Sequence, residues 1–243
     1  MELAEIKEDA KNMLEGKKLK CALVALIPAL FEMIIAIIFH DTLNSTGLVP
    51  TIVNIFNMII VIFLNLGCLS YFLKLSRNEE VEIGEVFSKG SLLIKALLIS
   101  ICTAIAVFAG TLLFIIPGII LAFSYSMIEY IILDNPDIGI IESMTKSRYM
   151  MKGHKWEYFC LGLNIIAWPL IILIITSIIL AIISSQMFVT GTLLSAIIII
   201  GFTIYYYVSI VPHLYIAISM FYNNLIENTN DKVTEEVIDS NEQ

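Results

Sequence analysis

Residues 135–156 read NPDIGIIESMTKSRYMMKGHKW, and this polar stretch separates two long apolar runs. The chain has 243 residues, of which 58% are hydrophobic and only 15% are charged. A soluble domain has roughly 45–50% apolar and about 25% charged residues. The excess apolar residues lie in runs longer than about 18 residues, which is typical of membrane-spanning helices. The sequence therefore predicts an all-α, polytopic membrane protein.

Six apolar runs predict six transmembrane helices, paired as three helical hairpins within a membrane domain of residues 1–223. The expected spans are residues 19–39, 50–73, 92–114, 119–133, 158–184 and 193–222. A tight turn is expected at residues 116–118, because Pro117 fixes φ and Gly118 permits a positive φ. A brief loop is expected at residues 185–191. Residues 224–243 hold six acids and one lysine, which predicts an acidic, disordered cytoplasmic tail.

The distribution of positive charge predicts the orientation. Of the 14 Lys and Arg residues, five precede the first span, four flank the second-to-third connection, four lie in the fourth-to-fifth connection and one lies in the tail. In a six-span topology all of them fall on one side, which the positive-inside rule places in the cytoplasm. We therefore expect a multi-pass protein of the cell membrane with both termini cytoplasmic. The first 20 residues carry five acids and five lysines, so no cleaved signal peptide is expected.

Each predicted hairpin follows an amphipathic stretch that ends at or near a glycine. Residues 3–15 place apolar side chains at three- and four-residue spacing and stop before Gly16. Comparable stretches end near Gly90 and Gly153. The pattern predicts three units, each a cytoplasmic amphipathic interfacial helix followed by a hairpin. The alternative is that segments beside a membrane converge on Lys and Gly for anchoring and helix capping.

The opening stretch predicts a helix anchored at the cytoplasmic interface. Asn135 and Pro136 are expected to end the fourth span, Asp137 to cap the new helix and Gly153 to end it. Acids precede bases along the stretch, which is the order that the helix dipole favours. Its basic end is expected to contact anionic headgroups of the lipid bilayer or a membrane-protein partner through Lys146, Arg148, Lys152, His154, Lys155 and Trp156.

No pattern in the sequence predicts an enzyme. The motifs HExxH, GxSxG and the P-loop are absent, and the three histidines lie on different segments. We expect no cofactor and no metal site, because zinc spacing and a redox CxxC are missing among Cys21, Cys68, Cys102 and Cys160. Nucleic-acid binding is not expected either, since no dense basic patch with interleaved aromatic residues occurs.

Two ionisable residues fall inside predicted spans. Glu32 lies 12 residues after Lys20, and His213 lies 10 residues before Asn223. These spacings place them ~18 Å and ~15 Å from the cytoplasmic edge at 1.5 Å per residue. The matched depths predict either a Glu32–His213 pair in a proton-linked or substrate path, or two unrelated polar residues satisfied by Ser, Asn or water.

The opening stretch also resembles a bacterial integral-membrane family known as domain of unknown function, family 975. That family's pattern starts Asn-Pro-Asp-Ile, here residues 135–138, and ends Ser-Arg-x-x-Met-x-Gly-His-Lys-Trp, here residues 147–156. Residues 116–119 and 124–127 are similar to it too. The resemblance covers roughly residues 4–226. It implies a cytoplasmic-membrane protein, mostly of Gram-positive bacteria, with no assigned activity. This chain departs from the pattern at Glu129, where Pro is usual, and at His213, where Tyr is usual.

We therefore expect a non-catalytic integral protein of the bacterial cytoplasmic membrane that acts through lipid or protein contacts, in an envelope-associated or membrane-protective role. The alternative is a small transporter, or the membrane subunit of one, with a midplane site near Glu32 and His213. Pro28 and Pro212 lie near these residues and favour paired helix breaks, a pattern typical of transporter sites. A polar cavity that reaches both residues would favour transport.

Overall fold

The computed structural model describes residues 3–40, 47–184, 197–198 and 200–241. These residues form helices and short connections, and none of them lies in a strand. The predicted all-α class is confirmed. The expected loop at residues 185–191 and the expected start of the sixth span at residue 193 lie outside the described ranges.

The α-helices are, in chain order, α1 (Leu3–Leu14), α2 (Lys18–Ile38), α4 (Leu48–Ser76), α5 (Leu93–Leu113), α6 (Ile115–Ser124), α7 (Ile128–Asp134), α8 (Ile140–Met150), α9 (Lys155–Ser184) and α11 (Val211–Asn241). Two 3-10 turns, η1 (Ile83–Phe87) and η2 (Gly90–Leu92), precede α5, and a π turn, η3 (Tyr206–Ile210), leads into α11. Six segments are long and apolar enough to span a membrane, and they overlap the six predicted spans. The fourth segment is split, since residues 125–127 separate α6 from α7.

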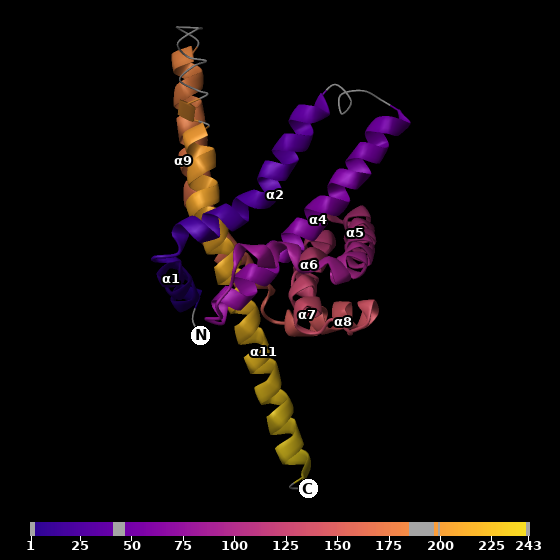
Figure 1. The fold of residues 1–243 in the computed structure, drawn as a ribbon. Helices are drawn as coiled ribbons and strands as arrows, with labels where there is room; N and C mark the ends of the chain where they lie inside the picture. Colours follow the sequence, from indigo (N-terminus) through magenta and orange to yellow (C-terminus); the bar gives the residue numbers. More distant parts are fainter. Residues whose placement is uncertain (1–2, 41–46, 185–196, 199, 242–243) are drawn as a thin grey trace.

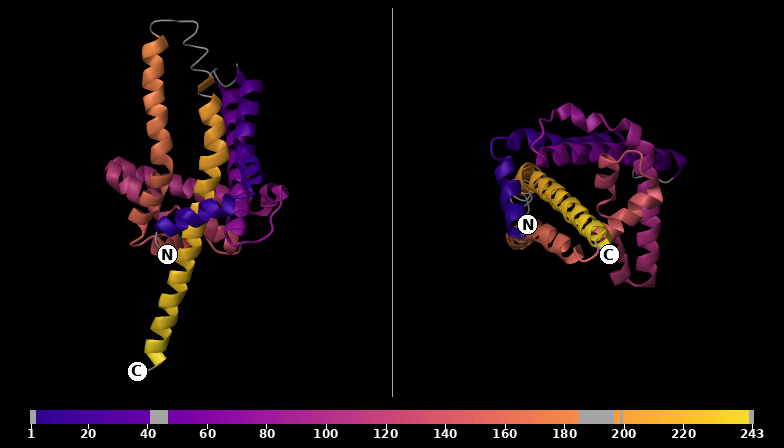
Figure 2. Two further views of the ribbon diagram at one scale, coloured as in Figure 1. Left: turned by 90° about the vertical axis from the view of Figure 1, so that its left-hand side faces the viewer. Right: turned by 90° about the horizontal axis from the view of Figure 1, so that it is seen from below.

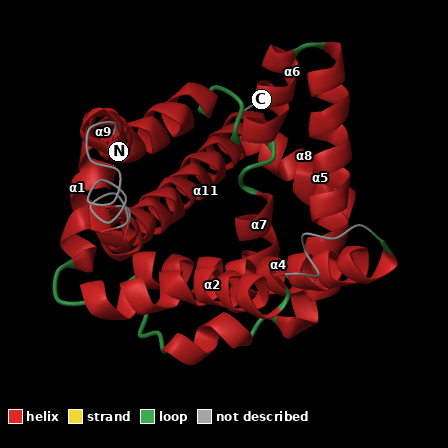
Figure 3. Ribbon diagram, turned by 90° about the horizontal axis from the view of Figure 1, so that it is seen from above, coloured by secondary structure: helices red, strands yellow, loops and turns green. Residues whose placement is uncertain are grey.

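The helices extend from a common base. Figures 1 and 2 show α2, α4 and α9 rising from the level of α1, α7 and α8, while α11 passes through that level and continues beyond it to the C-terminus. The hairpin of α5 and α6 projects sideways, crosswise to α9 and α11 (Figures 2 and 3). We call the end of the molecule that carries α1, α8 and most Lys and Arg residues the basic side.

The largest buried cluster lies in this base. Ile6 of α1, Phe72 of α4 and Ile216 of α11 belong to it and are at most 1% exposed. Farther along the helices the apolar side chains face outward, as Ile37 of α2 and Ile174 of α9 do with 68% and 56% exposure. Apolar surface that continues along whole helices is the kind that a bilayer covers.

The turn between α5 and α6 lies earlier than expected. Phe114 is extended, with φ −160° and ψ 152°, and breaks the helix there. Pro117 lies in the first turn of α6, where its missing N–H costs no helical hydrogen bond. Gly118 does not have a positive φ. It is needed because a Cβ there would lie 2.1 Å from the Thr111 hydroxyl of α5. The expected turn at residues 116–118 is therefore wrong.

The amphipathic stretch before α5 forms η1 and η2 in place of the expected interfacial helix, whereas α1 and α8 are α-helices. Glu85 of η1 holds this segment against α4. Its carboxylate accepts a hydrogen bond from Ser70 at 2.8 Å and pairs with Lys74 and Lys89 at 3.0 Å each. These tertiary contacts, together with Gly84 and Gly90, favour short turns over a regular helix.

The segment expected to be a disordered tail is helical as far as Asn241, within α11. No Gly or Pro interrupts the sequence after Pro212, so a helix that is already nucleated in the membrane domain continues at little cost. Leu225 is 3% exposed and belongs to the base cluster. The helix therefore continues without a break across the boundary predicted at residue 224.

Gly67 of α4 lies so close to the backbone of η1 that we expect a larger residue there to destabilise the protein. A Cβ on Gly67 of α4 would lie 1.8 Å from the Val86 carbonyl oxygen and 2.5 Å from its carbonyl carbon, which are backbone atoms that cannot rotate away. We expect Gly67→Ala to lower the stability of the detergent-solubilised protein by about 1–3 kcal/mol, the usual cost of overpacking. Thermal unfolding followed by size-exclusion chromatography measures this. Gly162→Ala is the matched control, because nothing lies within 4 Å of its Cβ position. Equal unfolding temperatures for both variants would contradict the prediction.

Candidate functional site

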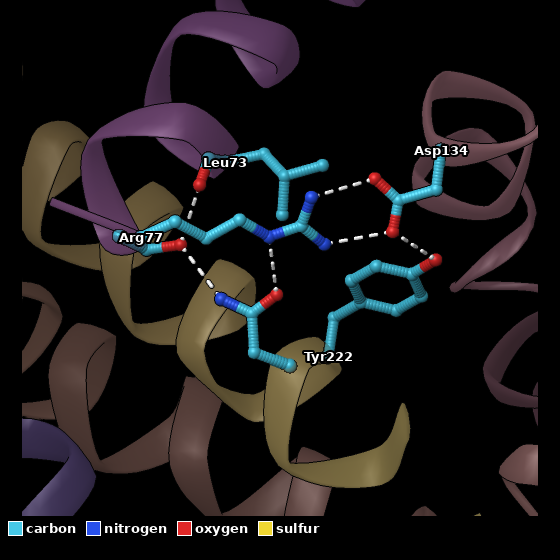
Figure 4. A network of polar contacts seen from close by, with 6 residues as sticks. Leu73, Arg77, Asp134 and Tyr222 are labelled. Atoms are coloured by element: carbon cyan, nitrogen blue, oxygen red, sulfur yellow. Dashed lines mark hydrogen bonds and ion pairs between the residues drawn. The ribbon is translucent and has the colours of Figure 1, made fainter. Parts of the chain in front are cut away.

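An ion pair joins three helices at the basic side. Arg77, the C-cap of α4, donates two parallel hydrogen bonds to Asp134 at the end of α7, at 2.8 and 2.7 Å (Figure 4). The Tyr222 hydroxyl of α11 donates to the same carboxylate at 3.0 Å. These bonds to Asp134 raise the pKa of the Arg77 guanidinium above its ordinary value. A guanidinium fork suits this geometry, because it binds a carboxylate through two N–H groups at once.

The same network extends to the next residue of α11. Arg77 Nε donates to the Asn223 side-chain carbonyl at 3.0 Å, and the Asn223 amide donates to the Ser76 hydroxyl at 3.0 Å. These hydrogen bonds connect the ends of α4 and α7 with α11. We therefore assign Arg77, Asp134, Tyr222 and Asn223 a structural role.

A second polar region lies between α1, α9 and α11. Two adjoining cavities of about 310 and 550 Å³ share four lining residues, which are Lys7, Lys11, Asn164 and His213. We call the two cavities together the α1 cleft. Lys18 at the start of α2 also lines it, and Glu8 is the only acidic residue among the lining side chains of both cavities.

Hydrogen bonds from α1 position the polar wall of the α1 cleft. Lys7 Nζ donates to the Asn164 side-chain carbonyl of α9 at 3.1 Å. The His213 Nε2 of α11 donates to the Lys7 backbone carbonyl at 3.1 Å. Within the described part of the chain, Lys11 and Lys18 make no hydrogen bond or ion pair. Two ammonium groups thus line the cleft without a counter-charge of their own.

The other wall of the α1 cleft is apolar and aromatic. Trp168 and Pro169 of α9 line it together with Tyr205, and Trp168 is 68% exposed. The cleft therefore joins a cationic region to an apolar wall along the membrane helices. An anion attached to an aliphatic chain matches both surfaces, because the charge meets lysines and the chain meets an aromatic wall.

The expected Glu32–His213 pair does not form. His213 bonds to the Lys7 carbonyl instead, and no hydrogen bond or ion pair joins it to Glu32 among the described residues. Glu32 is exposed on α2 and lines neither cavity of the α1 cleft. Of the two alternatives, the structure favours two unrelated polar residues, because depth along a helix says nothing about the direction in which its side chains point. The polar cavity that would have favoured transport thus reaches His213 and not Glu32.

The predicted contact residues around α8 are placed on its outward side. Lys146, Arg148, Lys152 and Trp156 are exposed, and His154, just before α9, bonds to Glu157 of α9 at 2.8 Å. Lys155 begins α9 and is half-buried. The inward side of α8 is formed by buried Ser143, Ser147, Met150 and Met151. Ile141 on the outward side is 80% exposed.

The predicted stop and cap residues are placed as follows. Asn135 is the C-cap of α7, followed by Pro136. Asp137 is not the N-cap of α8: Gly139 takes that position, and the Glu142 carboxylate accepts a hydrogen bond from its N–H at 3.4 Å. Gly153 lies between α8 and α9 with φ 94°, a left-handed conformation that favours glycine.

Other polar groups do not form a reactive site. No group of three or more His, Cys, Asp or Glu residues gathers within the described ranges in a way that would hold a metal ion. The four cysteines are free thiols. Asn65 accepts a hydrogen bond from the Tyr215 hydroxyl at 3.3 Å, while the buried Asn57 carbonyl has no partner. The α1 cleft combines lysines with an aromatic wall, and it is therefore a candidate binding site.

Sequence reasoning missed the α1 cleft and the Arg77 network. Lys7 and Lys11 enter the prediction from sequence only as two of the five lysines that precede the first span. Arg77 and Asp134 could have been selected as candidates from the sequence, because each is a charged residue near the end of an apolar run. Nothing in the sequence identified them as partners.

Comparisons with known proteins give one family. Residues 105–229 match the family described as protein of unknown function (DUF975), which is slightly more than half of the chain. Neither the curated proteins nor the solved structures contain a significant match.

The hydrogen bonds of Arg77 predict that a positive charge alone at this position does not preserve the stability of the protein. Arg77→Lys keeps the charge but cannot donate two parallel bonds to Asp134 and a third to Asn223. We expect it to lower the free energy of unfolding by about 1–2 kcal/mol, since the pair is only partly buried. Thermal unfolding in detergent measures the loss. Arg148→Lys serves as control because Arg148 is exposed, and an equal loss in that variant would contradict the assignment.

Proposed function

The chain belongs to this family of unknown function, and we propose that it is a non-catalytic integral membrane protein that binds anionic lipid headgroups on its basic side. The observation that carries the proposal is the α1 cleft, where lysines and an amide meet an apolar, aromatic wall. The six apolar segments found among the described residues support a position of this cleft beside lipid. An envelope-associated or membrane-protective role is the class of function that this binding serves.

We propose further that the basic side faces the cytoplasm, in a bacterial cell membrane. The support is the charge distribution: all 14 Lys and Arg residues fall on one side of the predicted topology. The cytoplasmic leaflet carries the anionic lipids that attract such charges, at about 1 kcal/mol for each Lys or Arg near the surface. The exposed lysines and arginine of α8 contribute to the same attraction without forming a cavity of their own.

The geometry of the α1 cleft supports binding over surface attraction alone. Lys7 is held by Asn164, and α1 is held by the bond between its carbonyl and His213, so the position of the cleft is fixed before a ligand arrives. A site that is already ordered costs less entropy to occupy. Lys11 and Lys18 are then the two groups whose charge a phosphate oxygen would neutralise.

One observation favours the alternative of a small transporter. The π turn η3 lies directly before Pro212 and His213, and π turns within helices are frequent at functional sites. In that case Glu32→Gln and His213→Ala would each abolish the rescue of a deletion strain under envelope stress. Lipid binding in the α1 cleft requires only that His213 keep α1 in place, so Glu32→Gln would then rescue fully.

The test of headgroup binding uses a pair of lysines. We expect Lys11→Ala/Lys18→Ala to weaken the binding of phosphatidylglycerol to the purified full chain about tenfold or more, from ~1 kcal/mol for each charge. Native mass spectrometry of the protein with phosphatidylglycerol or phosphatidylcholine measures the bound lipid. We expect the double variant to bind less phosphatidylglycerol than the unmodified protein and the same amount of phosphatidylcholine.

The control is Lys17→Ala/Lys20→Ala, which removes the same charge from the same segment but from residues outside the α1 cleft. Equal loss of binding in both double variants would show diffuse electrostatic attraction and would overturn the site.

A further inference from the structure

The α5–α6 hairpin is tightly packed, and Lys95 near its base is its only charged residue. No Asp, Glu, Lys or Arg occurs between Lys95 and Glu129. At the far end of the hairpin the two helices touch, since a Cβ on Gly110 would lie 3.2 Å from the Gly118 Cα and 2.6 Å from a Leu121 methyl group. The tip of α5 therefore cannot leave α6, and the two helices must enter any membrane together.

The base of the hairpin is fixed to α8 and α7. Ser147 of α8 donates a hydrogen bond to the Ser124 carbonyl at the end of α6, at 2.8 Å. Lys95 near the start of α5 donates to the carbonyl of Pro136, just after α7. Since α8 exposes Lys146 and Arg148, and Lys152 just after it is exposed too, α8 and the base of the hairpin suit the membrane surface on the basic side.

The length of α6 limits how deep the tip can reach. Its 10 residues span ~15 Å at 1.5 Å per residue, whereas the hydrocarbon core of a bilayer is about 30 Å thick. Because α6 starts at the tip and ends at Ser124 beside α8, the tip lies at most about halfway across the core. The crosswise position of α5 and α6 in Figure 2 makes the depth smaller still.

The composition of the tip indicates where it resides. Leu112, Leu113, Phe114, Ile115 and Ile116 follow one another and are 69–78% exposed. The hydroxyl of the neighbouring Thr111 is satisfied by the Val107 carbonyl at 2.8 Å. The connection before α4, by contrast, reads HDTLNSTG at residues 40–47 and suits water. A tip with five large apolar side chains and no free polar group is suited to acyl chains.

We propose that α5 and α6 form a re-entrant hairpin, inserted into the leaflet on the basic side without crossing the bilayer. The chain then crosses the membrane four times, through α2, α4, α9 and the helix that continues into α11. The partner of the hairpin surface is the acyl region of one leaflet. A pair of helices that occupies one leaflet alone enlarges the area of that leaflet relative to the other. The hairpin therefore favours membranes whose convex surface lies on the basic side.

The experiment measures the depth of the tip in the full-length protein. The four native cysteines are replaced, Phe114→Cys is introduced, and a spin label on it is examined in liposomes by power saturation with oxygen and a nickel chelate. Leu48→Cys, at the start of α4, and Lys152→Cys, after α8, mark the two membrane faces. We expect position 114 to lie within the half of the bilayer nearer to Lys152→Cys, and an impermeant maleimide to label it from neither side.

Two outcomes overturn the proposal. Labelling of Phe114→Cys from the same side as Leu48→Cys would show that α5 and α6 cross the bilayer completely. Efficient disulfide-linked dimers of Phe108→Cys, with that position protected from oxygen, would show that the hairpin packs against a second copy of the chain. If removal of the cysteines unfolds the protein, Phe114→Trp in a Trp156→Phe/Trp168→Phe background gives the same depth from quenching by brominated lipids.

Discussion

The ion pair between Arg77 and Asp134 is the constraint on which the basic side of this protein depends. The pair joins the C-terminal ends of α4 and α7. Hydrogen bonds to Tyr222 and Asn223 attach these two helix ends to α11. Apart from this network and the hydrogen bond from Tyr215 of α11 to Asn65 of α4, the three helices meet mainly through apolar side chains, which pack closely but set position only loosely. The bidentate ion pair and its hydrogen bonds to Tyr222 and Asn223 fix how the three helices are aligned along one another. The end of α7 in turn determines where α8 begins, and α8 holds the base of the α5–α6 hairpin through Ser147.

Helix α1 contributes more than an interfacial anchor. Its apolar face is buried in the base, with Ile6, Ala10 and Leu14 at most 4% exposed, so it is part of the packed structure. Its polar face supplies two different groups to the same cleft, the ammonium of Lys7 and the carbonyl of Lys7. The cleft exists because an amphipathic helix lies across α9 and α11 and not parallel to them. Removing α1 would therefore expose the base and abolish the cleft together.

The spans were predictable because the length of an apolar run alone determines whether a helix can cross a bilayer. For α4 the expected range 50–73 lies within the observed Leu48–Ser76. What the sequence does not contain is the rotation and tilt of each helix. Glu32 and His213 have matching predicted depths, yet His213 donates its hydrogen bond to the Lys7 backbone carbonyl of α1 and not to Glu32. Likewise, Pro117 and Gly118 looked like a turn, although the real requirement was space for Thr111. Such requirements come from neighbours that lie far away or on another element.

The uninterrupted length of α11 has a consequence for the acidic end of the chain. From Asn224 to Asn241 the helix extends ~27 Å at 1.5 Å per residue. Electrostatic screening in physiological salt reduces a surface potential over about 8 Å. The backbone of the last helical turns therefore lies beyond the reach of the membrane's surface potential, so the acid-rich end of the sequence meets the ions and macromolecules of the aqueous phase.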